Sequence, residues 1–245
     1  MKVSIFITCI VDQVFPEVGV KMVDCLTRLG VDVQFNDAQT CCGQPAYNTG
    51  YFREARDVAR QTLAVLEDDL KTADYVVTPS GSCAAMIKRH FDDLFSVDEA
   101  LRKRAANVAR RVFEFTEFLT EVLNFEDVGA VFPGRVTYHD SCHLRRELGV
   151  ADGPRKLIQS VHGIDFVEMT DAEACCGFGG TFSVKYADIS RSIAEAKASQ
   201  VEQSGVEAVV ACDASCLMQI SGELKRRGSR IRCMHIAELL ASEIN

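Results

Sequence analysis

Cysteines carry the main chemical signal of this chain. Eight of its eleven cysteines fall into two sets of four, and each set contains a lone cysteine, a Cys-Cys-Gly doublet and a last cysteine. The first set is Cys9, Cys41, Cys42 and Cys83, and the second is Cys142, Cys175, Cys176 and Cys216. Thiolates are soft metal ligands, and four of them per site is the common number for an iron–sulfur cluster. The pattern therefore predicts two metal sites, and two 4Fe–4S clusters are the favoured cofactors.

Glycines follow both doublets. Gly43 follows the first, and Gly177, Gly179 and Gly180 follow the second. Glycine lets the backbone approach a bound group closely and leaves its amide free to donate a hydrogen bond to cluster sulfur. We expect these four glycines to contribute to cofactor binding.

Three other interpretations of the cysteines stay open. Structural zinc also accepts four thiolates, but zinc ligands usually come as two close pairs, whereas these are spread over about 75 residues. A dithiol catalyst would cycle the doublet, or Cys212 with Cys216, as a disulfide. Cysteine is also a common small core residue, and this is the favoured interpretation for Cys25, on the apolar face of a predicted helix, and for Cys233.

Composition narrows the functional class. A net charge of −8 argues against a general nucleic-acid binder, which normally presents a basic surface. No apolar run approaches the roughly 18 residues of a membrane span, and the start lacks the pattern of a signal peptide. A cytoplasmic location is expected, where thiols stay reduced. Neither a Gly-x-Gly-x-x-Gly fingerprint nor a Walker loop is present, so no nucleotide cofactor site is evident.

The cysteine sets belong to an internal duplication. Shifting the chain by 133 residues places KVSIFITC over RVTYHDSC, and ADYVVTPSGSC over VEAVVACDASC. Strands alternate with helices in both halves, which indicates parallel βαβ units. The sequence predicts two small α/β domains with parallel sheets, related by a pseudo-twofold axis. We place the first domain at residues 1–128 and the second at 129–245, because Gly129, Pro133 and Gly134 break the pattern.

Three strands are expected in each half before a closing helix. A strand leads to the first cysteine, and a second short strand precedes the doublet. A longer helix follows, at about 51–70 and 187–203, and the third strand, at 74–78 and 206–211, ends just before the last cysteine. The ligands then lie beyond the carboxyl ends of strands, where open α/β sheets place their sites.

Polar residues flank the second set but not the first. His139, Asp140, His143 and Arg145 surround Cys142, whereas Phe6, Ile7 and Ile10 surround Cys9. These four polar residues are candidates for catalysis. The histidines and the aspartate could tune a metal or move protons, with strand-end packing and capping as the alternative. Arg145 could bind a carboxylate, with a solvated helix start as the alternative. His235 is expected to be structural. In the segment 96–111, Ser96 and Glu99 predict a capping box.

Several segments resemble one known family. CCGQPAYNTG from Cys41, SGSCAAMIKRHF from Ser80, HDSCHLRRELGV from His139, CCGFGGTFSVK from Cys175 and DASCLMQI from Asp213 are similar to the lactate utilization protein A family. This family is a branch of the duplicated cysteine-rich CCG-domain iron–sulfur oxidoreductase subunits, which also include a subunit of heterodisulfide reductase. The resemblance implies an electron-transfer subunit of a multi-protein system that oxidises L-lactate to pyruvate, with lactate utilization proteins B and C as partners.

The chain departs from the broader group at one position in each half. Subunits of the heterodisulfide reductase type carry a fifth cysteine where Ser80 and Asp213 stand here. We therefore expect four cysteine ligands per site, with Cys212 as a candidate fifth ligand of the second. Two alternative functions remain: a cluster-based thiol or disulfide reductase subunit, and a zinc-stabilised assembly scaffold.

Overall fold

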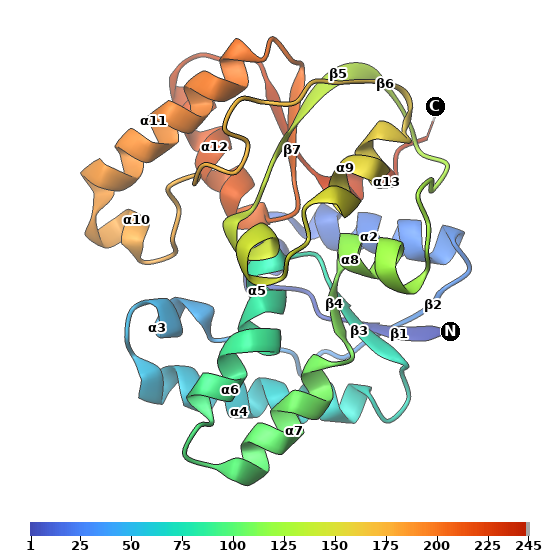
Figure 1. Ribbon diagram of the computed structural model, residues 1–245, viewed down its shortest axis with the longest axis vertical. Helices are drawn as coiled ribbons and strands as arrows, with labels where there is room; N and C mark the ends of the chain where they lie inside the picture. Colours follow the sequence, from blue (N-terminus) through green and yellow to red (C-terminus); the bar gives the residue numbers. More distant parts are fainter. Residues whose placement is uncertain (244–245) are drawn as a thin grey trace.

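The computed structural model describes residues 1–243 as two α/β halves stacked along the long axis (Figure 1). The first half contains β1 (Lys2–Ile5), α1 (Cys9–Val14), α2 (Pro16–Arg28), β2 (Asp32–Phe35), α3 (Gln44–Asn48), α4 (Phe52–Asp69), β3 (Tyr75–Thr78), α5 (Gly81–Ala85), η1 (Met86–His90), α6 (Phe91–Leu94), α7 (Glu99–Ala109), β4 (Val112–Glu114), α8 (Phe115–Glu117) and η2 (Phe118–Val122). The second half contains β5 (Val131–His139), η3 (His143–Glu147), α9 (Asp152–Gln159), β6 (His162–Phe166), α10 (Phe182–Lys185), α11 (Ala187–Gln203), β7 (Ala208–Ala211), α12 (Ala214–Arg226), β8 (Arg232–His235) and α13 (Ile236–Leu240). The elements labelled η are π-helical turns.

Each half forms one parallel sheet of four strands. The strand orders are β2-β1-β3-β4 and β6-β5-β7-β8, so the two sheets have equivalent topology. The predicted duplicated α/β fold with parallel sheets is confirmed. The prediction of three strands per half was incomplete, because β4 and β8 were missed. Both are short, and each leads directly into the helix that closes its half, so they carry no separate periodic signal.

The connection between the halves differs in detail from expectation. Pro133 and Gly134 break the pattern of the sequence as a boundary would, yet both lie inside β5. The pairing of β5 with β6 is irregular between Val131 and Gly134, which accommodates the missing amide of the proline. The proposed division at 128/129 falls between η2 and β5 and stays a prediction.

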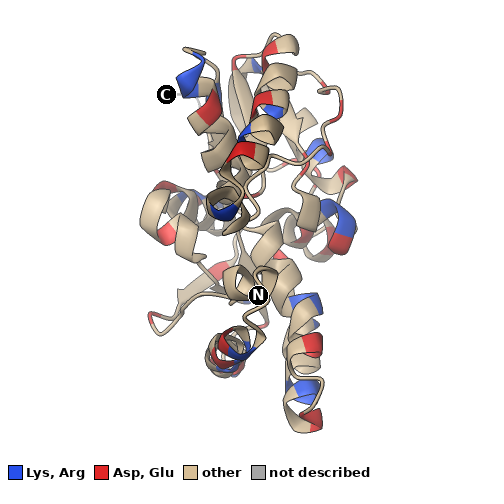
Figure 2. Ribbon diagram, turned by 90° about the vertical axis from the view of Figure 1, so that its left-hand side faces the viewer, with Lys and Arg blue, Asp and Glu red and all other residues tan. Residues whose placement is uncertain are grey.

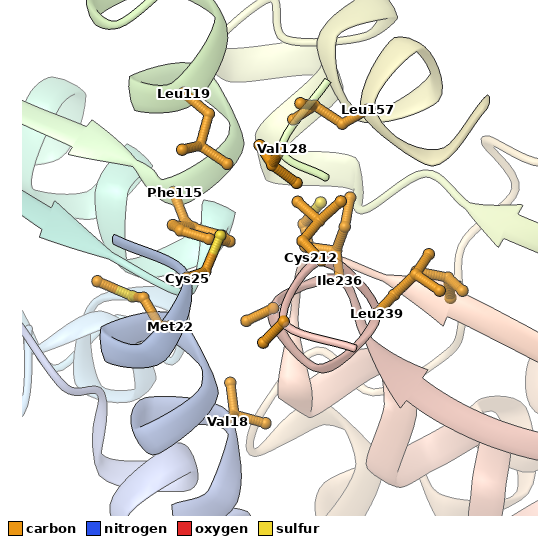
Figure 3. Close-up of a cluster of buried hydrophobic side chains, with 14 of the residues drawn as sticks. Val18, Met22, Cys25, Phe115, Leu119, Val128, Leu157, Cys212, Ile236 and Leu239 are labelled. Carbon is orange, nitrogen blue, oxygen red and sulfur yellow. The ribbon is translucent and has the colours of Figure 1, made fainter. Parts of the chain in front are cut away.

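The largest hydrophobic core is shared by both halves. It lies between the two sheets and is formed by α2, α8, η2, α9 and α13 (Figure 3). The closing helix of each half packs against the other half: α8 contacts α9, and α13 contacts α2. Two smaller cores cover the outer faces, one under α4 and α7 and one under α11 and α12. The relative position of the two sheets, and of everything at their edges, is therefore fixed by packing.

Charged residues of both signs are mixed along the outer helices (Figure 2). The basic residues of α7 take part in this pattern, since Arg102 pairs with Asp92 and Arg104 with Glu67. The predicted capping box at Ser96 was wrong: the N-cap of α7 is Asp98, next to the first helical residue, and its side chain accepts the amide of Leu101. Within residues 1–243, no helix has the length and apolar character needed to cross a membrane.

Candidate metal centre

All eight cysteines of the two sets line one cavity of about 110 Å³ between the halves. The cavity lies beyond the carboxyl ends of the central strands. Cys9 begins α1 after β1, and Cys142 follows β5 at the same place in the second half. Cys83 and Cys216 lie in the first turns of α5 and α12, after β3 and β7. The sequence predicts these cysteines at strand ends, and the structure adds that both sets line the same cavity.

The first set consists of a deep pair and an outer pair. Cys42 and Cys83 are buried, with 3.2 Å between their Sγ atoms. Cys9 is exposed and Cys41 half-buried, and their Sγ atoms are 3.9 Å apart. The amide of Gly43 lies 3.4 Å from the Cys41 sulfur. Four sulfurs thus converge, with a backbone donor beside them.

The second set repeats this arrangement. Cys176 and Cys216 are buried, while Cys142 is half-buried and Cys175 exposed. The amide of Gly177 donates to the Cys175 sulfur over 3.3 Å, as Gly43 does in the first half. Each set of thiols has the donor chemistry of a soft metal or an iron–sulfur group.

The thiols of each set share their protons unevenly. Hydrogen bonds from Cys42 and Cys9 lower the pKa of Cys41 to about 3, and those from Cys142 and Cys176 lower the pKa of Cys175 to about 2. The partners that donate these bonds have raised pKa values, because the same bonds and burial stabilise their protonated forms. A hydrogen bond with Cys176, opposed by burial and helped by His139, lowers the pKa of Cys216 to about 6. Thiolate is the form that binds metal, so each doublet begins with a cysteine ready to do so.

The glycines of the doublet loops have conformations that favour glycine. Gly43 and Gly177 both have φ of +89°, a region that residues with a side chain rarely adopt. Space is also short: a Cβ on Gly177 would lie 2.5 Å from the carbonyl oxygen of Ser190, and one on Gly43 would lie 3.2 Å from that of Ala55. Gly179 and Gly180 line the cavity, also with positive φ.

Two of the four candidate catalytic residues lie beside the sulfurs. His143 lines the cavity, with Nδ1 3.5 Å from the Cys142 sulfur. His139, at the end of β5, is buried below the deep pair, and one of its ring nitrogens lies within 4.8 Å of the sulfurs of Cys176 and Cys216. Both histidines are therefore placed to act on the second set.

The other two candidates bind each other. Asp140 is buried, and Arg145 donates to it over 2.9 Å. Arg155 holds the same carboxylate with two bonds, of 3.0 and 2.8 Å, and also binds Glu168. Neither Asp140 nor Arg145 lines the cavity. The sequence did not predict a role for Arg155, because nothing around this residue indicates that it pairs with Asp140.

Cys212 is not brought to the cavity. It lies in the shared core, where its sulfur is 3.2 Å from the hydroxyl of Tyr138 (Figure 3). Cys25 lies in the same core, and Cys233 packs against the outer core of the second half. His235 caps α13: its Nδ1 accepts the amide of Ala237, and its Nε2 faces the carbonyl oxygen of Pro79 across the halves.

Ser80 and Asp213, which stand where the broader group has a fifth cysteine, connect the two halves; this connection is called the joint below. Ser80 and Asp213 pair as an isolated antiparallel bridge. They are 133 residues apart, which is the repeat offset, so a pseudo-twofold axis brings these equivalent positions together. The Asp213 carboxylate accepts the amide of Ser82 over 2.9 Å and the hydroxyl of Ser215 over 2.7 Å. It therefore ties the turn of Cys83 to the turn of Cys216.

A buried lysine near the second set was also missed. Lys197 of α11 is 1% exposed, and its Nζ donates to the carbonyl oxygen of Asp171 over 2.7 Å, just before the doublet. Burial lowers its pKa, and negative charge on the neighbouring cysteine and carboxyl groups opposes that shift. The signal was available: Ala194, Ala198 and Val201 mark the buried face of this helix, and Lys197 lies on that face.

Comparison with known proteins identifies the fold unit and the relatives. The cysteine-rich domain family, CCG, matches residues 3–88 and again 136–221. Lactate utilization protein A of Geobacillus kaustophilus is 48% identical over 240 residues, covering 98% of both chains. Its counterpart in Oceanobacillus iheyensis is 48% identical over 98% of this chain and 96% of that one. A putative Asp/Glu racemase from Yersinia pestis covers 98% of this chain and 96% of its own, but a TM-score of 0.42 at 10% identity is too distant to inform function. With two cysteine-rich domains and near full-length identity of this size, the chain belongs to the lactate utilization protein A family.

Proposed function

We propose that this protein is an iron–sulfur electron-transfer subunit of a multi-protein system that oxidises L-lactate to pyruvate. The observation that carries the proposal is the convergence of two complete four-cysteine sets on one cavity. The names of the relatives supply the connection to lactate utilization. We further propose that lactate utilization proteins B and C are the partners and that the system works in the cytoplasm.

The residues of the site divide into three roles. In each half the four cysteines hold the cofactor, which we propose to be a 4Fe–4S cluster; such a cluster supplies one-electron redox chemistry. Gly43 and Gly177 hold the doublet loop and direct an amide at a sulfur. The exposed cysteines, Cys9 and Cys175, mark where each site is closest to solvent and hence to a redox partner.

Iron and acid-labile sulfide should be measured on anaerobically purified protein, together with its visible and electron paramagnetic resonance spectra. We expect about eight irons and eight sulfides per chain, as two 4Fe–4S clusters require. Cys175→Ser or Cys176→Ser should remove about half of the iron. Cys233→Ser is the matched control and should keep all of it, because Cys233 lies away from the cavity. A colourless protein that contains zinc would refute the proposal.

A thiol or disulfide reductase is the second candidate function. It is favoured by the shared cavity, since a sulfur substrate between the two sets would reach both of them. If this function is correct, addition of a thiol to the oxidised protein should produce a new paramagnetic signal from the iron. If the first proposal is correct, addition of lactate together with the partner proteins should reduce the iron–sulfur centres of this protein. Zinc without iron would instead support the assembly scaffold.

A further inference from the structure

The second cysteine set has a neighbour that the first set lacks. His139 is 1% exposed, and its nearest donor nitrogen lies within 4.8 Å of the sulfurs of the buried pair Cys176 and Cys216. In the repeat alignment its counterpart is Phe6, which is equally buried. The two halves therefore differ at the floor of the site, where one has a nitrogen donor and the other only an apolar ring.

The imidazole of His139 has no other partner. Both Nδ1 and Nε2 are buried, and neither has a hydrogen-bond partner apart from the neighbouring sulfur of Cys216. Buried polar groups are almost always satisfied, and an exception needs an explanation such as an ion that belongs beside it. Among the described residues, His139, Cys176 and Cys216 are also the one group of three whose donor atoms lie close enough to share a metal, all within 4.8 Å of one another.

We infer that His139 is a nitrogen ligand of the metal held by the second cysteine set. This site then has five donors, four sulfurs and one imidazole nitrogen, whereas the first site has four sulfurs. Imidazole is a common ligand of iron, and histidine occurs beside cysteine among the ligands of known iron–sulfur centres. The inference rests on the proposed function in one respect only, that the second set binds iron.

The remaining histidine of the site provides the comparison. His143 also lies beside the second set, but Glu147 lies 3.6 Å from its Nε2 and its ring is partly exposed. It therefore has protein and solvent partners outside the cysteine set, where His139 has none. A metal-bound nitrogen should come from His139 alone.

The test is pulsed electron paramagnetic resonance on the full chain, purified anaerobically, reduced to a paramagnetic state and labelled with ¹⁵N in histidine only. A strongly coupled histidine nitrogen is expected in the wild-type protein, and it should be lost in His139→Phe. That variant copies the residue of the first half, so the fold is expected to persist. His143→Gln is the matched control and should keep the coupling.

Two results would separate this inference from the proposed function. Iron at the expected level with only weak nitrogen coupling, of the size that a hydrogen bond to sulfur produces, would overturn ligation by His139 and leave the proposed function intact. Retention of the strong coupling in His139→Phe would do the same. Absence of iron would instead refute the proposed function itself. His139→Cys provides a second check: it restores a donor, so iron should be retained while the nitrogen coupling disappears.

Discussion

Replacing Glu114 with glutamine should stabilise the protein, and the gain should grow as the pH rises. Glu114 is fully buried between the halves, where its Oε2 accepts the amides of Thr116 and Glu117 and its Oε1 has no partner. Burial raises its pKa from 4.5 to about 8. The folded state therefore holds a proton that the unfolded state releases above pH 4.5, and stability must fall with pH between these two values.

The size of the effect follows from the two pKa values. At about 1.4 kcal/mol for each pKa unit, the gap between 4.5 and about 8 corresponds to about 5 kcal/mol once the pH exceeds both. At pH 5.5 the destabilisation is only about 1.4 kcal/mol, because the pH is then one unit above the pKa of Glu114 in the unfolded state. Glutamine keeps the acceptor oxygen of the cap and removes the titration. Its advantage over the wild type should therefore grow by about 3 kcal/mol from pH 5.5 to 8.5.

Anaerobic urea unfolding of both proteins at pH 5.5, 7 and 8.5 measures this difference. Titration of the thiols is common to both proteins and cancels in the comparison. His235, the residue equivalent to Glu114 in the repeat, is the matched control. Burial lowers its pKa from 6.5 to about 4, so its contribution is lost as the pH falls through that range. His235→Asn should therefore change the pH dependence of stability only on the acid side, below about pH 6.5. A difference between Glu114→Gln and wild type that is the same at all three pH values would refute the reasoning.

Three further predictions concern the second half. Lys197→Thr, which copies Thr62 of the first half, should lower the reduction potential of the second site because it removes a positive charge. At an effective dielectric constant of about 20 and a distance on the order of 10 Å between the charge and the site, this loss is worth ~1.7 kcal/mol, or roughly 70 mV for one electron. An unchanged potential in a redox titration would contradict the prediction. Gly177→Ala should lower the stability of the protein by at least about 1–2 kcal/mol and should reduce iron binding more than Gly43→Ala does. The reason is that its Cβ would lie 2.5 Å from a carbonyl oxygen, compared with 3.2 Å at Gly43. Equal iron contents in the two variants would show that the structure relieves this contact. Arg155→Met should destabilise the protein by about 1.5–3 kcal/mol, because the buried carboxylate of Asp140 loses the charged hydrogen bonds of Arg155 and keeps only Arg145. Unchanged urea unfolding would show that Arg145 alone is enough.

Much of the architecture could be predicted because the duplication repeats it. Two copies of each strand, helix and cysteine position reduce the ambiguity of either copy, so the central strands and the ends that carry Cys9 and Cys142 were placed correctly. The short strands β4 and β8 were not predicted because segments of three or four residues show no measurable hydrophobic period. A helical period gives the buried face of α2 but does not say that this face packs against α13 of the other half.

The polar environment of the site was less predictable. Asp140 was a catalytic candidate because it precedes Cys142, but its carboxylate is held by Arg145 and Arg155 outside the cavity. Adjacent residues on an extended segment point in opposite directions. His139 therefore faces the sulfurs and Asp140 faces away, and the sequence alone does not fix which of the two points inward. Only the strand's place in the sheet decides that.

The two sites are similar in their ligands and different in what surrounds them. At equivalent places the first half has Phe6 and Ile7 where the second has His139 and Asp140. The helix after each doublet continues the contrast: Ala55 and Ser190 face equivalent glycines, so seven residues later Thr62 and Lys197 are also equivalent. Buried polar and charged groups thus accumulate around the second set, and duplicated sites with matching sulfurs acquire different electrostatic environments.

The joint on the pseudo-twofold axis keeps these unequal sites in one geometry. One carboxylate, that of Asp213, binds the amide of Ser82 beside Cys83 and the hydroxyl of Ser215 beside Cys216. A movement of either ligand-bearing turn therefore strains a bond to the other. A cysteine in place of Asp213 would add a sulfur to the second set but would remove the carboxylate that makes this connection. The chain instead uses Asp213 to hold the two deep cysteine pairs in a fixed relation.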